Sequence, residues 1–199
     1  MADQRTIEFW YDFASTYSYL SAMRVEAMAQ AAGVGLAWKP FLLGPIFQAQ
    51  GWTTSPFNLY PVKGKYMVRD IERLAGERGL EFRLPPQFPQ NSLLAARVAL
   101  IGADEGWVGA FTRAIYLAQF RDGSTISDPQ VLGAVLDKLG LDPKAILART
   151  QEPAVKERLR QQTAEAQALG IFGAPSFVTG GEVFWGDDRL EQALSWTKR

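Results

Sequence analysis

Two serines three residues apart are the first side chains whose type and spacing suggest chemistry. Ser15 and Ser18 follow a short β-branched and aromatic run, Thr6–Tyr11, and precede a segment with helical periodicity. This pattern predicts a buried strand and then a helix N-cap, so Ser15 is expected where a strand meets a helix N-terminus. A hydroxyl donor there stabilises an anion, and the helix end itself adds roughly 0.3–1 kcal/mol. An isolated serine in this position is more often only a cap.

The composition limits what else the chain can do. Its 199 residues include no cysteine and no histidine, which excludes disulfide exchange, an imidazole base, a Cys/His zinc site and most hydrolase triads. With 21 Lys+Arg against 21 Asp+Glu, the zero net charge gives no basic surface for nucleic acid or an anionic membrane. We therefore expect a small-molecule ligand and no metal. Because residues 1–5 contain no apolar leader, we also expect a cytoplasmic protein.

The elements that must position Ser15 follow the order βαβ, then helices, then ββα. The chain between residues 15 and 33 is expected as one helix, and residues 44–60, rich in Gly, Pro, Ser and Thr, as a long loop. Gly180-Gly181 predicts a hairpin between two strands. The other strands are expected at residues 36–41, 176–179 and 182–185, and the other helices at 66–78, 91–103, 107–119, 129–139, 145–149, 153–169 and 188–196.

This order predicts an α/β protein with a thioredoxin-like fold (βαβ…ββα) that carries an inserted all-helical domain. Residues 1–43 and 171–199 would form the thioredoxin-like domain, and residues 44–170 the inserted helical domain. A chain of this length buries about 70% of its unfolded surface, which is enough for one well-formed core.

Three separated motifs carry a resemblance to a known family. The motifs are FWYDFASTYSYL at residues 9–20, FGAPSF at 172–177 and FWGDDRL at 184–190. On these motifs the chain resembles the 2-hydroxychromene-2-carboxylate isomerases and, more broadly, the kappa-class glutathione transferases of the DsbA-like superfamily, over essentially its whole length. One position departs from the family pattern, because proline usually follows the active serine and this chain has Thr16.

The resemblance implies glutathione as the cofactor. Ser15 and Ser18 occupy the positions that thioredoxin-like oxidoreductases fill with two cysteines, so the thiol would come from glutathione and the Ser15 hydroxyl would hold its sulfur ionised. A cis Pro175 would face the active helix, with the backbone of Ala174 pairing with the cysteinyl unit of glutathione. Without the resemblance, a trans proline would be the default.

The same resemblance assigns the two ends of glutathione. Asp187 and Asp188 would hold the γ-glutamyl end, although acidic residues in a first helical turn also stabilise that turn. Lys63 would contact the glycine carboxylate and is preferred to Lys65, with Asn58 as a weaker candidate for that end.

The resemblance further implies a glutathione-dependent isomerase, expected as a homodimer. It would interconvert 2-hydroxychromene-2-carboxylate and trans-o-hydroxybenzylidenepyruvate in the catabolism of naphthalene-like aromatic compounds, by addition of the thiolate, bond rotation and elimination. Phe47, Trp52 and Phe57 are candidates to shape the acceptor pocket. One alternative is a kappa-class-like transferase or peroxidase that acts on another electrophile. The other is a non-catalytic thioredoxin-like binding module.

Overall fold

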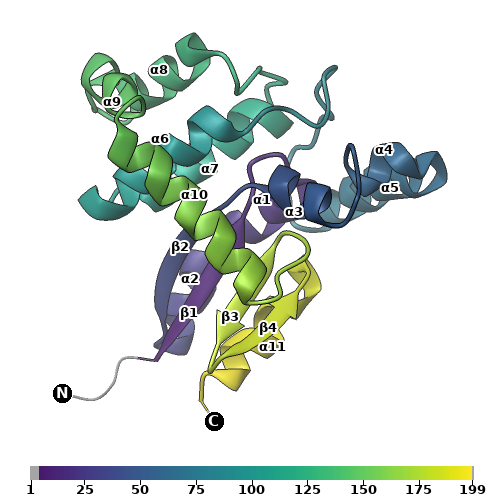
Figure 1. Ribbon diagram of the computed structural model, residues 1–199. Helices are drawn as coiled ribbons and strands as arrows, with labels where there is room; N and C mark the ends of the chain where they lie inside the picture. The colour runs from purple at the N-terminus through teal and green to yellow at the C-terminus, as the bar shows by residue number, and fades with distance from the viewer. Residues whose placement is uncertain (1–4, 199) are drawn as a thin grey trace.

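A four-stranded sheet forms the centre of the computed structural model, which describes residues 5–198 (Figure 1). Residues 1–4, from which the cytoplasmic location was expected, lie outside the described residues. The strand order is β2-β1-β3-β4, with β1 parallel to β2 and antiparallel to β3, and β3 antiparallel to β4. The strands are β1 (Thr6–Tyr11), β2 (Gly35–Pro40), β3 (Ser176–Thr179) and β4 (Glu182–Trp185).

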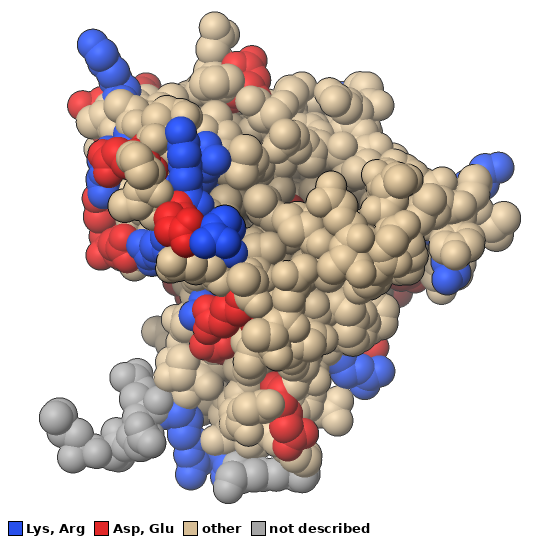
Figure 2. Space-filling model, in the orientation of Figure 1, with Lys and Arg blue, Asp and Glu red and all other residues tan. Residues whose placement is uncertain are grey.

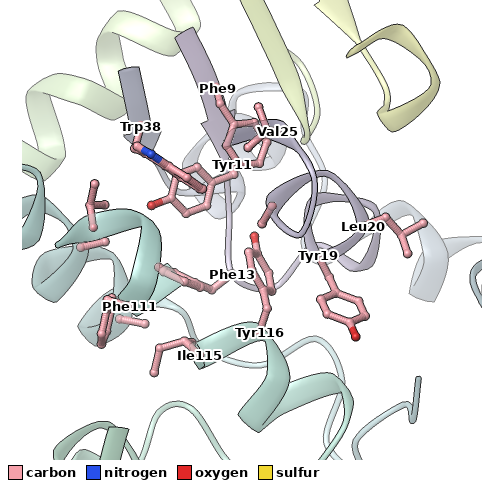
Figure 3. Close-up of a cluster of buried hydrophobic side chains, with 14 of the residues drawn as sticks. Phe9, Tyr11, Phe13, Tyr19, Leu20, Val25, Trp38, Phe111, Ile115 and Tyr116 are labelled. Carbon is pink, nitrogen blue, oxygen red and sulfur yellow. The ribbon is translucent and has the colours of Figure 1, made fainter. Parts of the chain in front are cut away.

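Alternating side chains of β1 build two cores, one on each face of the sheet. Phe9 and Tyr11 stack at 4.9 Å on one face and belong to the larger cluster, whereas Trp10 points to the other face and packs with Phe41. This alternation follows from the two-residue period of a strand. In Figure 3 the rings of the larger cluster run from Phe9 and Tyr11 to Tyr116, a residue of the helical part of the chain.

The segment expected as one helix after Ser15 consists of α1 (Thr16–Ala22) and α2 (Val25–Ala32). Arg24 separates them with non-helical backbone angles, and its side chain contacts Asp187, far away in sequence. The break between α1 and α2, which the local periodicity did not predict, therefore coincides with an ion pair to a residue far away in sequence. The expected stop at Gly33 is confirmed, because Gly33 has a φ of 68°.

The prediction of a long loop at residues 44–60 is wrong. The segment contains α3 (Leu43–Ala49) and α4 (Pro56–Leu59). Pro45 and Pro56 both lie in a first helical turn, where the missing N–H costs no hydrogen bond. The Asp12 carboxylate accepts from the Leu43 N–H at 2.7 Å and so caps α3 from another part of the chain.

Most of the remaining helices lie close to their expected positions, but the helix expected from residue 66 begins at Pro61, so Lys63 lies within its first turn. Asp128 and Asp142 cap α8 and α9 through their side chains, and each is followed by proline at the first helical position, as predicted. The helix expected at residues 188–196 begins as a 3₁₀ turn, η1 (Asp187–Arg189), and continues as α11 (Leu190–Trp196). The others are α5 (Pro61–Glu77), α6 (Leu93–Glu105), α7 (Val108–Phe120), α8 (Pro129–Lys138), α9 (Pro143–Arg149) and α10 (Pro153–Ala168).

Helices cover both faces of the sheet. In Figure 1, α10 crosses in front of the sheet, α6 to α9 gather at the top, and α4 and α5 extend to the right. Residues of α3 and α10 join Trp10 in the smaller cluster, and residues of α2 and α11 pack on the opposite face. Within residues 5–198, none of the helices combines the length and the apolar character needed to cross a bilayer.

Candidate functional site

Ser15 connects the N-terminus of α1 to the loop before β3. Its side chain accepts from the Ser18 N–H at 3.2 Å, which makes Ser15 the N-cap of α1. The same hydroxyl donates to the carbonyl oxygen of Ala174 at 2.9 Å. Ser15 is half-buried, so its oxygen can meet a ligand without unfolding of the helix. The functional and the capping interpretations of Ser15 are therefore compatible.

The Ala174–Pro175 peptide bond is cis, as the family resemblance implies. Pro175 is buried, and its carbonyl accepts from the Gly186 N–H at 3.0 Å, which joins this loop to the end of β4. Within residues 5–198 the N–H of Ala174 has no hydrogen-bond partner. Ala174 therefore presents a free N–H donor beside Ser15. Its carbonyl accepts from Ser15 with one of two lone pairs, so Ala174 can still pair with an extended peptide as in a strand.

Ser18 has a different environment from Ser15, although the two share a motif. Ser18 is fully buried, next to the phenol of Tyr116, which itself donates to the Asp12 carbonyl at 2.9 Å. Burial raises the pKa of Tyr116 well above its usual value, so this phenol stays protonated. Of the two serines, only Ser15 is therefore placed to contact a ligand.

Asp12 lies directly after β1, beneath the loop that carries Ser15. Its side chain is buried and accepts from the N–H groups of Ala14 at 2.9 Å and Leu43 at 2.7 Å. Burial raises the pKa of Asp12, and hydrogen bonds from Leu43, Ser92 and Ala14 only partly offset this effect. Sequence reasoning did not single out Asp12, although an acidic residue directly after a buried strand is a recognisable signal.

Asp187 is at the centre of a buried ion-pair cluster. One carboxylate oxygen accepts from the Ser21 hydroxyl at 2.8 Å and lies 3.2 Å from Arg24 Nη2, and the other lies 2.6 Å from Arg78 Nη2. Its side chain is only 3% exposed. Both oxygens are therefore already used within the protein, and the cluster connects η1 to α1 and to the capping residues of α2 and α5.

Sequence reasoning missed the partners of Asp187. Ser21, Arg24 and Arg78 lie between 109 and 166 residues away from it along the chain. No local motif indicates that a particular arginine pairs with so distant an acid.

Asp188 and Lys63 are both on the surface. The Asp188 side chain is 72% exposed and pairs with its neighbour Arg189 at 3.1 Å. Lys63 is exposed in the first turn of α5, with its amine 5.1 Å from the centre of the Tyr60 ring. The structure thus brings Ser15, Ala174 and Pro175 together and leaves the side chains of Asp188 and Lys63 exposed on the surface.

Among the three aromatic candidates for the acceptor pocket, Phe57 lines a cavity beside α5, and Phe47 and Trp52 are not among the residues that line it. Phe47 and Trp52 pack against each other, with ring centres 5.6 Å apart. Phe57, together with Asn58 and Lys65, lines an open cavity of about 380 Å³ beside α5.

Comparisons with known proteins agree with the fold. The family model of the DSBA-like thioredoxin domain matches residues 6–196. The chain is 29% identical over 188 residues to a 2-hydroxychromene-2-carboxylate isomerase of Sphingobium xenophagum, with 94% of this chain and 95% of the relative covered. It is 26% identical over 201 residues to the human glutathione S-transferase kappa 1, with 94% and 88% covered.

A solved structure shares the whole architecture. The structure of a 2-hydroxychromene-2-carboxylate isomerase superposes with a TM-score of 0.87 at 27% identity, and covers 98% of this chain and 95% of that one. The predicted thioredoxin-like α/β fold is confirmed, while the division into two domains stays a prediction. Since the family model spans nearly all the described residues, the chain belongs to the DsbA-like thioredoxin family.

Proposed function

We propose that the protein is a glutathione-dependent isomerase that interconverts 2-hydroxychromene-2-carboxylate and trans-o-hydroxybenzylidenepyruvate. The observation that carries the proposal is the accessible Ser15 hydroxyl, 2.9 Å from the Ala174 carbonyl, in a chain without cysteine or histidine. Relatives named 2-hydroxychromene-2-carboxylate isomerase, which match this chain over nearly its whole length, support the choice of reaction.

Ser15 and Ala174 would bind the centre of glutathione. Bound glutathione supplies a thiolate, a nucleophile that this chain lacks. The Ser15 hydroxyl has a single proton, so it would give up its bond to the Ala174 carbonyl, donate to the sulfur instead and lower the pKa of the thiol. Because α1 has only seven residues, we assign most of this stabilisation to the direct hydrogen bond rather than to the helix dipole. The N–H and carbonyl of Ala174 would pair with the cysteinyl backbone and fix the sulfur next to Ser15.

The exposed side chains of Asp188 and Lys63 are complementary in charge to the γ-glutamyl amine and the glycine carboxylate of glutathione. Asp188 is exposed and pairs only with its exposed neighbour Arg189, so it would be open to the γ-glutamyl amine, whereas the buried Asp187 already binds Ser21, Arg24 and Arg78. We therefore assign the direct contact to Asp188 and give Asp187 the role of holding the turn that carries it. Lys63 would pair with the glycine carboxylate. The contact first predicted for Asp187 stays a prediction.

The test is to follow the absorbance of 2-hydroxychromene-2-carboxylate with purified protein, with and without glutathione. We expect turnover only with glutathione and full recovery of free glutathione at the end, because an isomerase returns its cofactor. Turnover without glutathione would overturn the mechanism.

A second candidate keeps the same glutathione site and changes the chemistry. Kappa-class glutathione transferases from human and nematode match 94% and 98% of this chain, which favours conjugation of an electrophile or reduction of a peroxide as the alternative. Consumption of glutathione in proportion to product would identify this candidate. A protein that binds no glutathione would instead be a non-catalytic binding module. The homodimer, the cytoplasmic location and the place in naphthalene catabolism stay predictions.

A further inference from the structure

The cavity beside α5 has apolar walls and lies close to Ser15. Its volume of about 380 Å³ falls in the range of small-molecule sites. Met67 lines it, and the sulfur of Met67 lies 3.3 Å from the Thr16 hydroxyl, which belongs to the residue after Ser15. One side chain therefore separates the cavity from the first turn of α1. Other residues that line it include Phe57, Val68, Pro85, Pro86 and Phe88.

Lys65, an exposed lysine, is the one charged residue among those that line the cavity. No acidic side chain lines it, and no ion pair within residues 5–198 involves Lys65. Asn58 adds a side-chain amide to the same wall. An uncompensated cation beside apolar walls is complementary to a ligand that is both apolar and anionic. In Figure 2 the visible face of the arm formed by α4 and α5 is mostly tan, with few charged residues.

The two lysines of α5 have different surroundings. Lys63 does not line the cavity and lies over the Tyr60 ring, whereas Lys65 lines the cavity one turn before Arg69. Two cations with separate surroundings can serve two anionic ligands. The acceptor brings a carboxylate in addition to the glycine carboxylate of glutathione, so Lys63 and Lys65 would each have a carboxylate to pair with.

We propose that this cavity is the acceptor site and takes a flat aromatic carboxylate, with Lys65 pairing with the carboxylate and the prolines and phenylalanines enclosing the ring. The inference rests on the proposed function, because that function supplies an aromatic carboxylate as the acceptor. It makes Lys65 a residue that determines specificity for the acceptor, whereas Lys63 would bind glutathione.

The test uses coumarin-3-carboxylate, a flat aromatic carboxylate, and its uncharged carboxamide, titrated by calorimetry. Lys65→Met should weaken the affinity for the carboxylate about tenfold, as expected for loss of one charge-assisted hydrogen bond. Lys65→Arg should recover most of this affinity. Binding of the carboxamide should be the same in the wild type and in Lys65→Met. In kinetic assays, Lys65→Met should raise KM for the acceptor and leave KM for glutathione unchanged.

Lys144→Met is the matched control, since Lys144 is an exposed lysine on α9. It should change neither affinity. An unchanged affinity of Lys65→Met for the carboxylate would overturn the proposal, and so would an equal loss for the carboxamide. Glutathione titrated separately tests the proposed function. If the wild type binds the carboxylate through Lys65 but does not bind glutathione, the proposed function fails and the cavity assignment stands.

Discussion

At the scale of single residues, Ser15 is both a helix cap and the group proposed to hold the sulfur. Ser15→Ala should cost about 1 kcal/mol of the free energy of unfolding through loss of the cap. The larger effect should be on the pKa of the bound thiol. Without the hydroxyl donor, this pKa should rise toward that of a free thiol, about 8.5. The thiolate fraction at neutral pH then falls, and the pH profile of kcat/KM moves to higher pH.

The thiolate absorbance of bound glutathione, titrated against pH, measures this shift directly. Urea unfolding of the same variant measures the stability cost separately. A variant that keeps the wild-type profile of kcat/KM with pH would show that the Ser15 hydroxyl does not hold the sulfur.

The adjacent acids Asp187 and Asp188 should separate a stability role from a binding role. Asp187→Asn removes a buried charge that two arginines share, and we expect a loss of about 3 kcal/mol in unfolding free energy. Asp188→Asn should leave stability nearly unchanged, because its carboxylate is exposed, and should weaken glutathione binding. Urea unfolding and glutathione titration of both variants measure the two effects. Equal stability losses in the two variants would contradict this assignment.

At the scale of elements, the close approach of α4 and α5 depends on Gly64. A Cβ at this position would lie 2.6 Å from the backbone oxygen of Phe57, which cannot move without displacing α4. Gly64→Ala should therefore destabilise the protein by about 1–3 kcal/mol. Gly76→Ala is the control on the same helix, with no atom within 4 Å of the added Cβ. It should stabilise by about 0.5–1 kcal/mol through helix propensity. Thermal unfolding of both variants measures these stability changes, and a change of the same sign in both would contradict the role of Gly64 in the packing of α4 on α5.

Asp12 joins the loop that carries Ser15 to the start of α3, and its burial gives a pH dependence. Because the pKa of Asp12 is raised in the folded state, the folded protein binds its proton more tightly than the unfolded chain does. The stability that Asp12 contributes is then fully present below its unfolded pKa and falls as pH rises through its folded pKa. The slope is at most about 1.4 kcal/mol per pH unit.

Asp12→Asn removes this titration. The difference in unfolding free energy between wild type and Asp12→Asn should therefore decrease as the pH rises above about 4. Urea unfolding at several pH values measures that difference. A difference that grows with pH would mean that the hydrogen bonds from Leu43 and Ala14 outweigh burial.

The sequence predicted well the elements whose bounds depend on nearby residues. Strand β1 was expected at its observed bounds, and the caps at Asp128 and Asp142 were located correctly. The missed features depend on distant partners. The capping of α3 needs Asp12 and the break before α2 accompanies the contact of Arg24 with Asp187, so neither has a local signal. The ligand-binding role of Ser15 and the cis bond at Pro175 were implied by the family resemblance, because the residues alone favoured a helix cap and a trans proline. The paired state of Asp187 required the fold.

At the scale of the whole molecule, the boundary between the expected domains does not divide the core. The larger cluster contains strand residues and residues of α6, α7 and α8 alike. Phe13, which follows β1, packs edge-on against Phe111 of α7 at 6.2 Å and lies 5.3 Å from Tyr116 (Figure 3). Tyr11 also hydrogen-bonds Thr112 of α7 at 2.8 Å, with both groups buried. The helices between β2 and β3 thus share one apolar interior with the sheet that carries Ser15.

A shared core predicts that the two parts of the chain unfold together. Far-ultraviolet circular dichroism reports mainly on the helices, and tryptophan fluorescence includes Trp10 and Trp38 of the sheet. We expect the two urea unfolding curves to coincide, as they do for a cooperative transition. Phe111→Ala should move both curves by the same amount and cost about 3–5 kcal/mol, because its ring is fully buried against the sheet side of the core. Two separated transitions, or a shift of the dichroism curve alone, would mean that the helical segment folds on its own. In that case the helices would not be the support that holds the loop of Ser15 and Asp12 in place.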